Sequence, residues 1–159
     1  MKNQNSDFNI YKTEEKLYDL GYRAICGVDE AGRGPLAGPV CVASCILPPF
    51  SRIEGINDSK KLSSKKREEL YKIIIKEAIA YNVVFVPEEV VDEINIYQAT
   101  KKGMLEAIEG LSVKADYVLI DAMPLHELET KHDSIIHGDA LSASIAAASI
   151  LAKVTRDHY

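Results

Sequence analysis

Four acidic residues of this chain stand where apolar segments end: Asp29, Glu30, Asp121 and Asp139. Ligand sites in open α/β sheets form where strand ends and helix starts meet, so these side chains could converge although they are far apart in sequence. Converging carboxylates raise each other's pKa and destabilise the fold unless a cation neutralises them. Oxygen ligands favour Mg²⁺ or Mn²⁺, and two such ions about 4 Å apart can activate a water and stabilise the leaving oxygen in phosphodiester cleavage.

Each acid also has a structural interpretation. Asp139 could cap a helix, Asp121 could begin a turn, and Glu30 could lie in solvent at the edge of a loop. Neighbouring residues on a regular strand point to opposite faces, so Asp29 and Glu30 can share a site only if the strand bends there. The glycines that follow make such a bend feasible.

A further acid, Asp157, is expected to lie outside such a site. It follows Asp139 by eighteen residues on the same expected helix, which corresponds to about 27 Å along the axis. We therefore expect a structural ion pair between Asp157 and Arg156 or Lys153.

A glycine-rich loop follows the first acidic pair, in the stretch "AGRGPLAGP". It matches neither G-x-G-x-x-G nor G-x-x-x-x-G-K-[ST], which argues against a kinase or a dinucleotide-binding protein. Glycines let backbone amides approach a sugar hydroxyl or a phosphate, and Arg33 could add a charged contact. The alternative is a tight hairpin turn, which would need fewer such residues.

A basic run lies in "DSKKLSSKKREE", with Lys60, Lys61, Lys65, Lys66 and Arg67. Such a run is usually the solvated start of a helix. A nucleic-acid groove is the other interpretation, and the position of the run relative to the acids must decide between them.

The local patterns predict an α/β fold, with a mixed sheet covered by helices. An early hairpin is expected from two strands around the glycine loop, and the alanine-rich last helix, with Asp139 as its N-cap, can lie close to a sheet. The predicted strands are 22–29, 39–47, 81–86, 116–122 and 134–138, and the predicted helices are 13–20, 63–80, 88–95, 96–111 and 139–159.

Composition favours one cytoplasmic domain with no membrane contact. The 159 residues suit a single domain, and no apolar run approaches the length needed to span a bilayer. The first residues are polar and resemble no export signal. Three cysteines lie in apolar segments without a C-x-x-C pair, which predicts buried, reduced thiols. The net charge of −5 argues mildly against attraction of nucleic acid to the whole surface, but not against a local groove.

The motifs "GVDEAGRGPLAGPV", "INDSKKLS", "INIYQAT", "VLIDAMPL" and "GDALSASIAAASILAKVTRD" resemble, in order and spacing, those of ribonuclease HII. The resemblance runs from about residue 22 to residue 157. It implies a ribonuclease H-like fold with a mixed five-stranded sheet. It also implies endonucleolytic cleavage of the RNA strand of RNA/DNA hybrids and incision on the 5′ side of a ribonucleotide in duplex DNA, leaving 5′-phosphate and 3′-hydroxyl ends. The implied cofactors are two Mg²⁺ or Mn²⁺ ions, and we expect a monomer.

The same resemblance assigns roles to individual residues. The catalytic, metal-binding acids are Asp29, Glu30, Asp121 and Asp139. Gly32, Arg33 and Gly34 match the loop whose backbone reads the ribose 2′-hydroxyl, the group that distinguishes RNA from DNA. Ser59 and Lys60 match a segment near the substrate backbone. Asn95 and Gln98 belong to a matching motif, and we expect them to be structural.

Two features depart from the family pattern. His137 precedes Gly138-Asp139 where the family commonly has lysine, so a phosphate contact or a local pKa could differ. Family members also continue beyond the chain's last residue, Tyr159, to a tyrosine that helps to recognise the RNA–DNA junction. We therefore expect residues 1–159 to form one catalytic domain, with 1–20 as an N-terminal extension and the C-terminal part of the family domain missing. The alternative function is a catalytically impaired fragment that binds hybrids.

Overall fold

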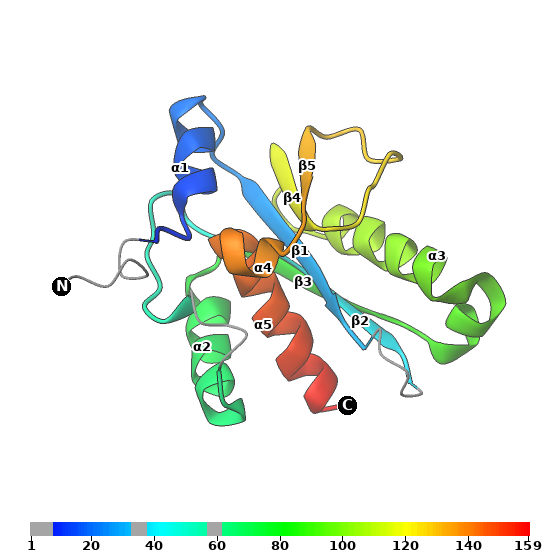
Figure 1. The fold of residues 1–159 in the computed structure, drawn as a ribbon. Helices are drawn as coiled ribbons and strands as arrows, with labels where there is room; N and C mark the ends of the chain where they lie inside the picture. The colour runs from blue at the N-terminus through cyan, green and yellow to red at the C-terminus, as the bar shows by residue number, and fades with distance from the viewer. Residues whose placement is uncertain (1–7, 33–37, 57–61) are drawn as a thin grey trace.

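The computed structural model describes residues 8–32, 38–56 and 62–159. Five strands form one sheet in the order β3-β2-β1-β4-β5, with helices on both of its faces (Figure 1). The strands are β1 (Ile25–Ala31), β2 (Val40–Ile46), β3 (Ala80–Val86), β4 (Tyr117–Asp121) and β5 (His132–Ile135). The helices are α1 (Lys12–Asp19), α2 (Ser64–Glu77), α3 (Glu88–Glu109), α4 (Gly138–Leu141) and α5 (Ala143–Asp157).

The sheet is mixed, as the sequence predicts. β2 pairs antiparallel with both β1 and β3, so β1 and β2 form the expected hairpin around the glycine loop. β4 lies parallel to β1 on one side and parallel to β5 on the other. Parallel neighbours end at the same edge of a sheet, so the acids in the last residues of β1 and β4 are brought to one edge.

The two faces of the sheet carry different helices. Alternate side chains of a strand point to opposite faces, and Val28 of β1 packs into the core under α3, whereas Ile25 packs against Ile145 of α5. Figure 1 shows α3 on one side of the sheet, at the right of the view, and α1, α2, α4 and α5 on the other side. The α3 core includes Cys26, Val42, Ile46, Met104, Val118 and Ile120.

Helix α5 lies directly on the sheet at Gly27. A methyl group placed on Gly27 would come within 2.1 Å of the backbone carbon and oxygen of Ser144 and within 2.5 Å of the Ile145 nitrogen. Only a residue without a side chain fits there. The prediction that the alanine-rich helix packs closely on the sheet is therefore confirmed.

Helix α3 is bent where the sequence predicts a separation between two helices. Asn95 has a φ of 72° and a ψ of 166°, outside the helical region. Its side-chain Oδ1 accepts a hydrogen bond from the Gln98 backbone nitrogen at 3.0 Å, which caps the second segment. Asn95 thus has the expected structural role.

Three predicted boundaries are wrong. Ala80 begins β3 instead of ending α2, and β5 lies at His132–Ile135 instead of 134–138. The expected last helix is broken at Ser142, whose backbone is extended, with φ −133° and ψ 126°. Ser142 rather than Asp139 is the N-cap of α5, since its Oγ accepts a hydrogen bond from the Ile145 nitrogen at 3.2 Å. Asp139 lies instead within the short helix α4.

None of the helices within the described ranges is long and apolar enough to cross a membrane. Cys26, Cys41 and Cys45 are buried free thiols, as the sequence predicts.

Candidate active site

Asp29 and Asp121 lie side by side at the edge of the sheet. The parallel register of β1 and β4 ends with Val28 opposite Ile120, so these acids occupy the next positions on the two strands. By strand alternation both point to the face that carries α5. Asp29 is only 4% exposed, and its Oδ1 accepts a hydrogen bond from the Glu30 backbone nitrogen at 2.8 Å.

Asp139 is placed beside Asp121 by helix α4. The Gly138 backbone nitrogen donates to Asp121 Oδ1 at 2.7 Å, so the carboxylate caps the start of this helix. His137 precedes it in the left-handed region, at φ 58° and ψ 37°, which turns the chain from β5 into α4. Asp139 itself is 6% exposed. This hydrogen bond joins Asp121 to Gly138, the residue immediately before Asp139.

The electrostatics of Asp29 connect all four acids. Burial raises the pKa of the Asp29 carboxyl well above its ordinary value, and the nearby charges of Glu30, Asp121 and Asp139 raise it further. Desolvation and like charges both disfavour the carboxylate. At this position a negative charge is therefore costly unless a cation accompanies it.

Glu30 does not approach Asp29 through a bend in the strand. The β1–β2 ladder continues regularly through Glu30 opposite Val42 and Ala31 opposite Cys41. The side chain of Glu30 therefore points to the face of β1 opposite to that of Asp29. Its charge still raises the pKa of Asp29. The bend that the sequence suggests is not present at this point. The following glycines are not needed for a bend at this point.

The donor set consists of carboxylate oxygens, which suit Mg²⁺ or Mn²⁺. Within the described part of the chain, no three His, Cys, Asp or Glu side chains are already arranged around a single ion position. The acids nevertheless belong to one electrostatic cluster. Their chemistry fits divalent cations, while ligand geometry would require side-chain rotation.

Arg156 of α5 contacts both ends of the glycine loop. Its Nε donates to the Pro39 carbonyl at 3.1 Å. Added methyl groups on Gly32 and Gly38 would meet its side chain at 2.8 Å and 2.9 Å, and both glycines have positive φ values, 95° and 128°. Sequence reasoning missed this contact because the partners are more than a hundred residues apart. Arg33 and Gly34, the other predicted loop residues, lie outside the described residues.

The basic run is divided between described and undescribed parts of the chain. Ser59 and Lys60 lie outside the described residues. Within α2, Arg67 donates to the Leu62 carbonyl at 2.8 Å and pairs with Asp157 at 3.8 Å. Asp157 is therefore structural, as expected, but the partner predicted for it was wrong. Arg67 serves as a link between α2 and α5 and not as a free surface charge.

A cavity of about 690 Å³ lies elsewhere, between the end of α3 and the loop before β5. Its lining includes Leu105, Lys114, Glu127 and Leu128, and none of the predicted site residues. Burial and neighbouring charges raise the pKa of Asp29. In the cavity, by contrast, a hydrogen bond from Lys101 lowers the pKa of Glu127. We take the acidic edge of the sheet as the candidate active site.

Comparisons with known proteins agree with this architecture. A ribonuclease HII from Caldicellulosiruptor bescii is 55% identical over 96% of this chain and 74% of its own length. A ribonuclease HII from Shouchella clausii is 53% identical over 94% of this chain, which spans only 58% of that relative. The crystal structure of ribonuclease H2 from Pyrococcus horikoshii superposes with a TM-score of 0.75, at 29% identity, over 84% of this chain and 72% of that one. The sequence profile of "Ribonuclease HII" matches residues 26–159, and the chain belongs to this family.

Proposed function

We propose that this chain is a metal-dependent endoribonuclease that cleaves the RNA strand of RNA/DNA hybrids. The finer activity in the proposal is incision on the 5′ side of a ribonucleotide embedded in duplex DNA, which leaves 5′-phosphate and 3′-hydroxyl ends. The observation that carries the proposal is the buried acidic cluster around Asp29, on a fold and in a family that perform this class of reaction. A cytoplasmic location is part of the same proposal.

Asp29, Glu30, Asp121 and Asp139 would hold two Mg²⁺ or Mn²⁺ ions. Burial raises the pKa of Asp29, and the charges of the other three acids raise it further, which supports a need for cations. Bound ions would supply a nucleophilic water at neutral pH and stabilise the oxygen that leaves phosphorus. The protein's own contribution is to fix the carboxylates: the Glu30 amide orients Asp29, and the Gly138 amide orients Asp121.

The substrate would lie across this edge of the sheet. We assign recognition of the ribose 2′-hydroxyl to Gly32, Arg33 and Gly34, and contact with the nucleic-acid backbone to Ser59 and Lys60. Support comes from the family motifs and from the position of Gly32 just after the β1 acids. Arg156 would keep the two ends of the loop in place.

The test is cleavage of two labelled duplexes, an RNA/DNA hybrid and a DNA duplex with one ribonucleotide, in Mn²⁺, Mg²⁺ or chelator. We expect metal-dependent cutting, which Asp29→Asn abolishes. Asp92→Asn is the matched control, since Asp92 is an exposed acid of α3 and is not among the charges that act on Asp29. Cleavage that survives both chelator and Asp29→Asn would refute the proposal. No cleavage by a folded sample that still binds hybrid would establish the alternative, a binding domain without activity.

A further inference from the structure

Helix α1 precedes the residues matched by the family profile, yet it buries Glu14, Leu17 and Tyr18 within the domain. Glu14 of α1 is 1% exposed, although it carries a carboxylate. Its Oε2 accepts hydrogen bonds from Ser142 Oγ at 2.7 Å and from the Ser144 backbone nitrogen at 2.8 Å. The proposed reaction gives this buried acid no role.

The N-terminal segment satisfies backbone donors at the start of α5. The first amide groups of a helix have no partner within the helix. Here the Ala143 nitrogen donates to the Ile10 carbonyl at 3.0 Å, and the Ser144 nitrogen donates to Glu14. The next amide donates to Ser142 Oγ. Two of the three bonds thus come from residues that the expected "N-terminal extension" contributes.

Ser142 also ends helix α4, which carries Asp139. The Ser142 nitrogen donates to the Gly138 carbonyl at 2.7 Å, so this single turn closes on itself. At its other end, the Gly138 nitrogen donates to Asp121. The turn that bears Asp139 is therefore held at one end by Asp121 and at the other by the Glu14–Ser142 hydrogen bond.

A carboxylate suits the position at the start of α5 better than a neutral group. The helix dipole favours a negative charge at its N-terminus, and both bonds to Oε2 are strengthened by the charge. The other oxygen, Oε1, is buried and accepts no hydrogen bond within the described residues. Both hydrogen bonds from Glu14 to the start of α5 therefore go through Oε2.

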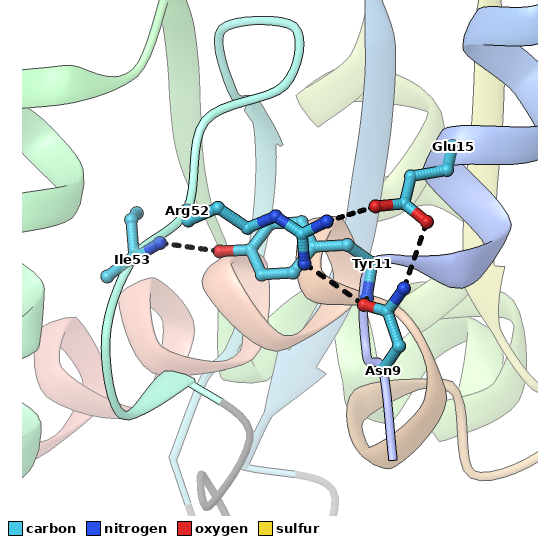
Figure 2. A network of polar contacts seen from close by, with 5 residues as sticks. All are labelled: Asn9, Tyr11, Glu15, Arg52 and Ile53. Carbon is cyan, nitrogen blue, oxygen red and sulfur yellow. Dashed lines mark hydrogen bonds and ion pairs between the residues drawn. The ribbon is translucent and has the colours of Figure 1, made fainter. Parts of the chain in front are cut away.

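Neighbouring contacts fix α1 against the rest of the domain (Figure 2). Arg52 pairs with Glu15 and lies over the Tyr11 ring at 4.5 Å, while Tyr11 Oη accepts from the Ile53 nitrogen at 2.7 Å. Asn9 joins the same network through Glu15 and Arg52. These bonds hold the start of α1, so Glu14 presents a fixed oxygen to α5.

We infer that Glu14 is a positioning residue for the metal site: through Ser142, it sets the place of the α4 turn and hence of Asp139. The inference rests on the proposed role of Asp139 as a metal ligand. Helix α1 would then belong to the catalytic domain, because it helps to position a metal ligand, and would not be a separate N-terminal extension.

The experiment measures Mn²⁺ affinity by calorimetric titration of the full chain. Outer partners of metal ligands typically change affinity 10- to 100-fold, so Glu14→Ala should weaken binding by about tenfold. The matched control, Asp19→Ala, removes an exposed carboxylate from the other end of α1 and should leave the affinity within about twofold of wild type. If Glu14→Ala does not fold, Ser142→Ala breaks the same link from the other side and should give the same loss.

A double-mutant cycle separates positioning from general destabilisation. If Glu14 acts through Asp139, Glu14→Ala should cause little further loss in an Asp139→Asn background. A full additional loss there, or an affinity within about twofold of wild type for Glu14→Ala alone, would overturn the inference.

A wild-type chain that binds no Mn²⁺ would refute the proposed function instead. Hydrogen exchange of the backbone amides then tests the role of Glu14. Glu14→Ala should reduce the protection of the amides of residues 138–146, and unchanged protection would overturn the inference.

Discussion

Replacing Gly27 with alanine should displace α5 from the sheet. The new methyl group would lie 2.1 Å from the Ser144 backbone, and this separation must lengthen to at least 3.4 Å for ordinary contact. Gly27 is not among the glycines with positive φ, so alanine would otherwise be tolerated or slightly stabilising. Because the backbone fixes the position of the methyl group and the atoms it meets belong to the backbone, no side chain can rotate away. We expect a loss of about 3 kcal/mol or more in the free energy of unfolding.

Thermal denaturation is the assay for Gly27→Ala. A loss of that size corresponds to a fall in Tm of roughly 6–12 °C for a domain of this length. Gly21→Ala is the control, since Gly21 has a φ of 101° and nothing within 4 Å of the added methyl group. The control should cost only the backbone strain, about 1–2 kcal/mol. A Gly27→Ala variant within about 1 kcal/mol of wild type would refute the close packing of α5 on β1.

Three further predictions concern the site and its supports. In the metal-free protein the raised pKa of Asp29 means that the folded chain keeps this proton to a higher pH than the unfolded chain. The contribution of Asp29 to stability should therefore fall as pH rises above the ordinary value of 3.8, and Asp29→Asn should have the higher Tm at pH 7 but not at pH 3. An equal pH dependence of the two proteins would contradict this. Ser44→Ala removes a 2.7 Å hydrogen bond to the Ala107 carbonyl of α3 and should cost about 1 kcal/mol in urea denaturation, with cleavage unchanged. Arg156→Ala removes the bond to Pro39 and should raise KM for the single-ribonucleotide duplex several-fold more than it lowers kcat, whereas an unchanged KM would argue against a role in the loop.

The local patterns predict most of the fold because they depend on short-range chemistry. The β1–β2 hairpin and the interruption of α3 at Asn95 follow from glycines, β-branched residues and a side chain that can cap a helix. The local patterns also predict five strands, of which only the fifth is clearly displaced along the chain, and the resemblance adds the ribonuclease H-like fold. The four acids were identified from their positions after apolar segments, and the structure places three of them next to one another through β1, β4 and α4.

The errors arise where distant residues decide the local structure. "GDALSAS" has the composition of a continuous helix, but the structure breaks it at Ser142, whose hydroxyl donates to Glu14, 128 residues earlier. Similarly, Asp157 pairs with Arg67 across the α2–α5 contact, because helix packing brings that residue closer than the sequence neighbours. The contact between Arg156 and Pro39 has the same origin. Such pairings cannot be deduced from spacing along one segment.

The convergence of the acids on metal ions is tested most directly by anomalous diffraction from crystals of the protein grown with Mn²⁺. The predicted result is one or two peaks within ligand distance, about 2.0–2.4 Å, of the carboxylates of Asp29, Glu30, Asp121 and Asp139. Peaks found only at other carboxylates, with none at this edge of the sheet, would contradict the proposed metal site and the mechanism built on it.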